Sequence, residues 1–143
     1  QDVSRILQSL IPNKKVHTVT NCYNQVFDSP TLWVPKLIPK IDGVTLLTIS
    51  ANYPHKNLMI IPEVIKYLSF NFPNVKVRFA LSLNSSEMPD MPLEAKEFIH
   101  FIGPVSIEEC PSLYSQADFL FLPTLLECFS ASYPEAMKME LPI

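Results

Sequence analysis

The spacing of hydrophobic and polar positions changes several times along the chain, and each spacing indicates a type of element. Residues 1–11 place apolar side chains at helical intervals, which predicts a helix. Residues 44–50 are a run of β-branched and apolar side chains, typical of a strand buried on both faces. Residues 57–70 return to an interval of three to four, so we expect an amphipathic helix that starts late or kinks near Pro62.

Strands and helices alternate through the rest of the sequence. The pattern predicts three further strands and two further helices: strands at 75–81, 98–102 and 118–122, and helices at 106–116 and 132–139. Both helices open with a Ser-x-x-Glu pattern typical of a capping box, Ser106 with Glu109 and Ser132 with Glu135. This alternation predicts an α/β fold, a Rossmann-like parallel sheet with helices on both faces.

The segment between the first helix and the first long strand is irregular. A short strand is expected at 16–19, and three prolines then break any regular structure up to residue 39. Residues 20–42 therefore have the character of a linker, and Trp33 is expected to pack it onto the domain. Since the sequence starts at Gln1 without methionine and ends as if entering another strand, we expect a piece truncated at both ends.

Composition narrows the classes of partner. A length of 143 residues fits one domain. The net charge is −3, from 11 basic and 14 acidic residues, so the chain lacks the excess of basic residues that binds a nucleic-acid backbone. The three cysteines are far apart and show no metal-ligand spacing, which indicates a reducing compartment and no zinc. The apolar runs are far shorter than the roughly 20 residues that span a bilayer. We therefore expect a cytoplasmic protein.

Candidate chemistry lies just after the predicted strands, because ligands of such sheets bind beyond the carboxyl ends of the strands. Lys56 follows the first strand, where it is either a solvated lysine or a ligand for phosphate. Val105 follows the third strand in a Gly-Pro turn. After the fourth strand, Pro134 places Glu127 in a loop and Glu135 in the first turn of a helix. A capping role explains Glu135 but leaves Glu127 without a structural explanation.

Two acids and one lysine suit a ligand that carries both hydroxyls and phosphates. Carboxylates accept hydrogen bonds from sugar hydroxyls, whereas a diphosphate suits Lys56 and the free N–H groups of residues 130–133. A nucleotide sugar meets this description. The chain has only Gly43 and Gly103, which excludes a Gly-x-Gly-x-x-Gly dinucleotide loop and a Walker phosphate loop.

A set of short motifs carries a resemblance to a known family. In order along the chain they are Thr18–Asn21, His55–Leu58, Phe101–Val105, Ala117–Thr124, and a Glu, seven residues, Glu signature from Glu127 to Glu135. Together they resemble the group-1 (family-4) retaining glycosyltransferases of the GT-B fold, specifically their C-terminal, donor-binding lobe. The resemblance covers most of residues 16–143.

The resemblance implies an enzyme that moves a sugar from a nucleoside diphosphate to an acceptor with retention of configuration. It implies no cofactor and no essential metal. By this analogy the catalytic residues are Lys56, which holds the diphosphate, and Glu127, which holds the donor sugar. The donor-binding residues would be Glu135 at the ribose, Val105 at the base, and Phe129, Ser130, Ala131 and Ser132.

The resemblance also implies a division of the chain and a set of partners. Residues 1–20 would be the remnant of an N-terminal lobe and the start of the linker, residues 21–42 the interlobe linker, and residues 43–143 the nucleotide-sugar-binding lobe. A carbohydrate or lipid-linked acceptor would bind the missing N-terminal lobe, which in such enzymes often touches the cytosolic face of the membrane. No nucleic acid partner is expected.

The sequence departs from the family at three positions, and two other functions stay open. An arginine common in the family near Ala51 is absent, and Cys128 and Ser130 replace glycines that commonly follow the first glutamate. The alternatives are a sugar-nucleotide epimerase of the same fold and a non-enzymatic α/β interaction module. The base, the sugar and the acceptor are not specified by these residues.

Overall fold

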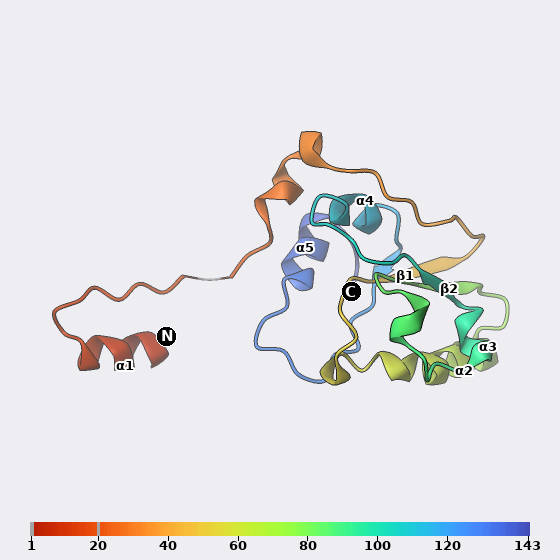
Figure 1. Cartoon of the computed structure of the whole chain (residues 1–143), viewed down its shortest axis with the longest axis horizontal. Helices are drawn as coiled ribbons and strands as arrows, with labels where there is room; N and C mark the ends of the chain where they lie inside the picture. Colours follow the sequence, from red (N-terminus) through yellow and green to blue (C-terminus); the bar gives the residue numbers. More distant parts are fainter. Residues whose placement is uncertain (1, 20) are drawn as a thin grey trace.

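A parallel sheet forms the centre of the computed structural model, which describes residues 2–19 and 21–143 (Figure 1). Its strands are β1 (Val44–Thr48), β2 (Val77–Leu81), β3 (Ile99–Phe101) and β4 (Phe119–Leu120). All pairs are parallel and the order in the sheet is β3-β2-β1-β4. The predicted α/β fold with a Rossmann-like parallel sheet is therefore confirmed.

Helices cover both faces of the sheet, as the alternating pattern predicts (Figure 1). One face carries α2 (Ile61–Asn71) and α3 (Leu93–Lys96), and the other carries α4 (Cys110–Tyr114) and α5 (Ser132–Lys138). Each face has its own core of buried side chains. Leu58, Ile61, Ile65, Phe79 and Leu81 belong to the α2 side, and Leu47, Ala80, Leu113, Leu120 and Ala136 belong to the α4 side.

The entry to β1 depends on a glycine. The Val44 N–H donates a hydrogen bond of 2.7 Å to the Lys76 carbonyl, which draws the backbone before β1 against the start of β2. A Cβ at Gly43 would lie 2.2 Å from the Lys76 carbonyl oxygen. Since no side chain fits at that distance, glycine allows the backbone before β1 to approach the backbone before β2.

The start of α2 confirms the effect expected of Pro62. The helix begins at Ile61 with Pro62 in its first turn, where a missing N–H costs nothing. Two short 3-10 turns precede it, Pro54–Lys56 and Leu58–Ile60, joined by Asn57 at φ 55°. The chain after β1 therefore forms a compact turn before the helix.

Three local predictions need correction. Residues 16–19 form no strand, because no neighbouring strand in the described chain offers a partner for them. The helix predicted at 106–116 is limited to Cys110–Tyr114, since Pro111 has no N–H for a helix begun earlier and fits only a first turn. The capping box predicted for Ser132 and Glu135 does not form: the N-cap residue of α5 is Ala131, and no side chain caps it.

The linker packs on the α4 side of the domain. The helix α1 (Asp2–Leu10) stands apart from the sheet, whereas residues 21–42 run across α4 and α5 before they enter β1 (Figure 1). Within this segment Phe27 is buried and meets Tyr114 edge to face at 5.7 Å between ring centroids. Trp33 is half-buried and its Nε1–H donates to the Val26 carbonyl at 2.8 Å, which confirms the packing role expected for it.

Residues 1 and 20, which fall within the predicted first helix and the Thr18–Asn21 motif, lie outside the described residues. After α5 the chain returns to β4, where the Leu120 N–H donates to the Pro142 carbonyl at 2.7 Å. Among the described residues, no helix combines the length and the apolar character that crossing a bilayer requires.

We predict that the linker contributes to the stability of the domain. Ile38→Ala should lower the free energy of unfolding by about 2–5 kcal/mol, because it removes a side chain that is only 5% exposed in the core. Leu37→Ala is the matched control, since Leu37 is 79% exposed and its truncation should change stability by no more than about 0.5 kcal/mol. Urea unfolding measures both. Equal effects would contradict the placement of the linker in the core.

Candidate functional site

The candidate site lies at the edge of the sheet where the four strands end. The strand order places β1 between β2 and β4, and the connections from β1 and β3 leave on opposite faces of the sheet. A crevice for ligands forms at such a reversal, between the carboxyl ends of the two strands that diverge. Here those strands are β1, followed by Lys56, and β4, followed by Glu127.

The loops after β1 and β4 are joined to each other. The Leu125 N–H donates to the His55 carbonyl at 2.8 Å, and Thr124 Oγ1 lies 3.1 Å from the same carbonyl oxygen. These contacts bring together segments about 70 residues apart in the sequence. They hold the loop that carries Glu127 beside the turn that carries Lys56.

Lys56 and Glu127 form an ion pair at this edge. Lys56 Nζ donates to Glu127 Oε1, and the two side chains are 20% and 17% exposed. Thr124 Oγ1 lies 3.1 Å from Glu127 Oε1, so its hydroxyl can donate there or to the His55 carbonyl. The hydrogen bond from Lys56 is the main cause that lowers the pKa of Glu127, with Thr124 adding to it. Glu127 is therefore held as a carboxylate.

Glu135 occupies a different environment. Its side chain is only 8% exposed, and Tyr114 Oη on α4 donates to Glu135 Oε2 at 2.8 Å. Burial raises the pKa of Glu135, and the hydrogen bond from Tyr114 opposes that rise. Burial also raises the pKa of Tyr114, followed by the charge of Glu135. Among the described residues, no hydrogen bond or ion pair joins Glu135 to Lys56 or Glu127.

A cavity of about 360 Å³ lies at the carboxyl ends of β1 and β2 and contains Val105. Its lining includes Ser50, Ala51, Ser82, Glu87, Pro104 and Val105. The turn before Val105 needs Gly103, whose φ is +77°. In the described part of the chain the backbone N–H and C=O of Val105 have no hydrogen-bond partner. These two groups are free to bind a ligand.

The remaining predicted donor-binding residues lie at or just before the start of α5. Phe129 is 42% exposed, Ala131 is exposed, Ser132 is half-buried and Ser130 is buried. The N–H groups of Ser130, Ala131 and Ser132 have no acceptor among the described residues. This part of the loop therefore presents unpaired backbone donors, as expected for a helix start.

A larger cavity, about 440 Å³, lies at the opposite edge of the sheet. Its lining includes Ile65, Leu68, Val77 and Phe98, beside the amino ends of β2 and β3. The lysine and the acids expected to carry chemistry are not part of it. Size alone therefore does not indicate the functional edge.

No family model matches the sequence, and no curated protein matches it. The chemistry assigned to the carboxyl edge therefore rests on the residues themselves. Within residues 2–19 and 21–143, no group of three or more His, Cys, Asp or Glu side chains is arranged to hold a metal ion.

Two residues of the site were not singled out by the sequence. Tyr114 sits on the apolar face of a predicted helix, where a buried tyrosine needs an acceptor for its hydroxyl, and that requirement is the signal that points to it. Thr124 lies in a quoted motif, Ala117–Thr124, but no local pattern indicates that it supports Glu127. Its role appears only once the loops after β1 and β4 are side by side.

We predict that Lys56 controls the ionisation of Glu127. Lys56→Met should raise the pKa of the Glu127 carboxyl, because the variant removes its hydrogen-bond donor and the nearby positive charge. A pH titration followed by carbon NMR of the carboxyl measures the change. Lys66→Met, at an exposed position on α2, is the control and should leave Glu127 unaffected. An unchanged pKa in Lys56→Met would contradict the ion pair.

We predict that Glu135 makes stability depend on pH. Because its folded pKa lies above the ordinary value of 4.5, the folded state keeps a proton that the unfolded chain releases. The contribution of Glu135 to stability should thus fall as pH rises from 4.5 to its folded pKa, by at most about 1.4 kcal/mol per pH unit. Glu135→Gln, which still accepts from Tyr114, should remove this contribution, so the difference between wild type and variant in urea unfolding should follow this slope over several pH values. The exposed Glu94→Gln should keep the slope, and parallel curves for all three proteins would refute the assignment.

Proposed function

We propose that this chain is the donor-binding part of a glycosyltransferase. The whole enzyme would transfer a sugar from a nucleoside-diphosphate sugar to an acceptor with retention of configuration, without an essential metal, and this chain alone would be inactive. The observation that carries the proposal is the Lys56–Glu127 pair at the diverging carboxyl ends of β1 and β4. This pair joins a cation suited to a diphosphate with a carboxylate suited to sugar hydroxyls.

The ammonium of Lys56 keeps capacity for a phosphate. It has three N–H donors, and in the described chain Glu127 accepts only one of them. The two others are available to oxygens of a diphosphate, while Glu127 keeps the ammonium at the edge. The unpaired N–H groups of Ser130, Ala131 and Ser132 supply further donors for the same charge.

The remaining residues suit the other parts of a nucleotide sugar. The free backbone groups of Val105 match the edge of a base, and Glu135 has a second oxygen, Oε1, without a donor among the described residues, which suits a ribose hydroxyl. The loops after β3 and β4 are three strand spacings apart in the sheet, about 14 Å. An extended ligand therefore places its base near Val105, its diphosphate near Lys56 and its sugar near Glu127.

Catalysis in this proposal is electrostatic. As the bond from the sugar to the diphosphate breaks, negative charge grows on the leaving phosphate, and the Lys56 ammonium stabilises it. The oxygen of the acceptor hydroxyl bonds to the reacting sugar carbon on the face that the diphosphate leaves, and its proton passes to the leaving phosphate, which yields retention. The acceptor, a carbohydrate or a lipid-linked sugar, is bound by a lobe outside these residues.

One observation favours a second function, an α/β interaction module without catalysis. The helix α1 stands apart from the sheet (Figure 1), and Val3, Ile6 and Leu10 on it are 70%, 59% and 71% exposed. Apolar exposure of this kind is typical of a surface that binds another protein. In such a module the ion pair of Lys56 and Glu127 would only hold the loops after β1 and β4 together and would bind no substrate.

Titration with nucleotides separates the two functions. We predict that UDP, GDP or ADP at millimolar concentration raises the melting temperature of the chain, because binding to the folded state alone adds about 2.7 kcal/mol at a hundredfold excess over Kd. Lys56→Met should abolish the increase, whereas Lys66→Met, at an exposed position, should retain it. Stabilisation of the wild type by none of the three nucleotides would favour the interaction module.

A further inference from the structure

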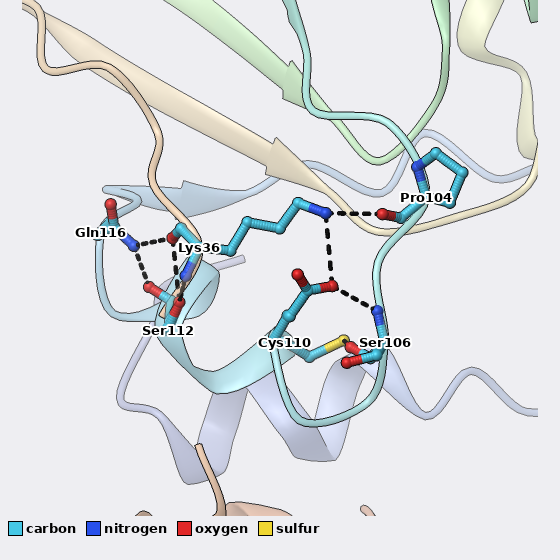
Figure 2. A network of polar contacts seen from close by, with 7 residues as sticks. Lys36, Pro104, Ser106, Cys110, Ser112 and Gln116 are labelled. Carbon is cyan, nitrogen blue, oxygen red and sulfur yellow. Dashed lines mark hydrogen bonds and ion pairs between the residues drawn. The ribbon is translucent and has the colours of Figure 1, made fainter. Parts of the chain in front are cut away.

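The linker is fastened to the α4 region by Ser112 of that helix and by Gln116, which follows its C-terminal end (Figure 2). Ser112 Oγ accepts from the Lys36 N–H at 2.8 Å and donates to the Lys36 carbonyl at 3.0 Å. Gln116 Nε2 also donates to the Lys36 carbonyl, at 2.7 Å, and Gln116 Oε1 accepts from the Ile38 N–H at 3.0 Å. The backbone around Lys36 is therefore fixed in position, and so is the start of its side chain.

The side chain of Lys36 reaches the loop that follows β3 (Figure 2). Its Nζ donates to the Pro104 carbonyl at 2.7 Å and lies 3.4 Å from Glu109 Oε2. Glu109 Oε2 in turn accepts from the Ser106 N–H at 2.7 Å, and this bond is the main cause that lowers the pKa of Glu109. One lysine of the linker thus holds the loop at Pro104 directly and at Ser106 through Glu109.

The two held points lie on either side of Val105. Gly103 turns the chain at φ +77°, the Pro104 carbonyl is held by Lys36, and the Ser106 N–H is held by Glu109. Between them, the N–H and C=O of Val105 have no partner in the described chain, and Val105 lines the cavity at the ends of β1 and β2. The orientation of these two free groups is therefore set from the linker.

We propose that Lys36 is a positioning residue that sets which base the nucleotide site accepts, an inference that rests on the proposed function. Hydrogen bonds to a base edge weaken steeply as their angle departs from linearity. A small rotation of the loop between Pro104 and Ser106 therefore changes how well Val105 matches one base over another. The diphosphate, held near Lys56 at the other end of the site, does not depend on this loop.

The ion pair of Lys36 and Glu109 contributes little to folding stability by itself. Their side chains are 23% and 22% exposed, and pairs so close to solvent contribute weakly. Lys36→Met keeps the aliphatic stem and the backbone contacts with Ser112 and Gln116, and removes only the ammonium. A change in nucleotide binding by this variant therefore reports on the position of the loop between Pro104 and Ser106, because the fold itself is kept.

Calorimetric titration tests the proposal with UDP, GDP, ADP and inorganic pyrophosphate. Lys36→Met should weaken the best nucleotide about tenfold and bring the three nucleotide affinities closer together, while pyrophosphate binding stays as in the wild type. Lys36→Arg keeps a donor and a positive charge and should restore most of the selectivity. Lys40→Met, an exposed lysine of the same linker, is the control without effect.

Hydrogen exchange links the change in selectivity to the loop. The Ser106 amide should exchange faster in Lys36→Met, while the Leu47 amide in β1 should keep its rate. Glu109→Gln, which keeps an acceptor for Ser106 but loses the charge facing Lys36, should show a smaller change in the same direction.

The outcomes separate this inference from the proposed function. A wild type that binds neither nucleotides nor pyrophosphate overturns both. A wild type that binds nucleotides, together with a Lys36→Met variant of unchanged selectivity or unchanged Ser106 exchange, overturns the role of Lys36 alone. Equal weakening of pyrophosphate and nucleotides in Lys36→Met also overturns it, because the loss would then not involve the base.

Discussion

The pairing of β4 with β1 is the contact on which the candidate site depends. The ladder itself is short, with Leu46 opposite Phe119 and Leu47 opposite Leu120. Bonds at both ends extend it. The Thr45 N–H donates to Asp118 Oδ2 at 2.8 Å, and beyond the other end Thr48 Oγ1 donates to the Phe121 carbonyl at 2.7 Å. Together they align the carboxyl ends of β1 and β4, so Lys56 and Glu127 emerge side by side.

The linker belongs physically to the domain that it precedes. Its apolar side chains, among them Phe27 and Ile38, enter the same core as α4 and α5. Its polar contacts run through Lys36 to the loop after β3. A displacement of this segment would therefore act on the core and on the loop of Val105 at once, because both are attached to it.

The two acids of the Glu, seven residues, Glu signature are ionised under different conditions. Glu127 is beside an ammonium, which favours its charged form, whereas burial of Glu135 disfavours charge and Tyr114 compensates in part. In the proposed donor site, Glu127 faces the reacting sugar as a carboxylate. Glu135 instead connects α5 to α4 through a buried hydrogen bond with Tyr114.

The sequence by itself determined the type and approximate position of most elements. A helix and a strand that each bury one face repeat their hydrophobic residues at different intervals along the sequence, so the interval indicates the element. Pro62 predicted a late start for α2, and Pro134 predicted a loop for Glu127 and a first turn for Glu135. Such local rules failed where a distant partner competed. Ser132 and Glu135 fit a capping box, yet Glu135 bonds Tyr114, 21 residues away.

Only the tertiary structure decided which groups meet. The ion pair of Lys56 and Glu127 spans 71 residues, and the bond from Lys36 to the Pro104 carbonyl spans 68. No interval in the sequence encodes such contacts, because they follow from the order of the strands in the sheet and from the side on which each connection returns. Strand order is set by the packing of both faces at once, whereas a periodic pattern reports on one element at a time.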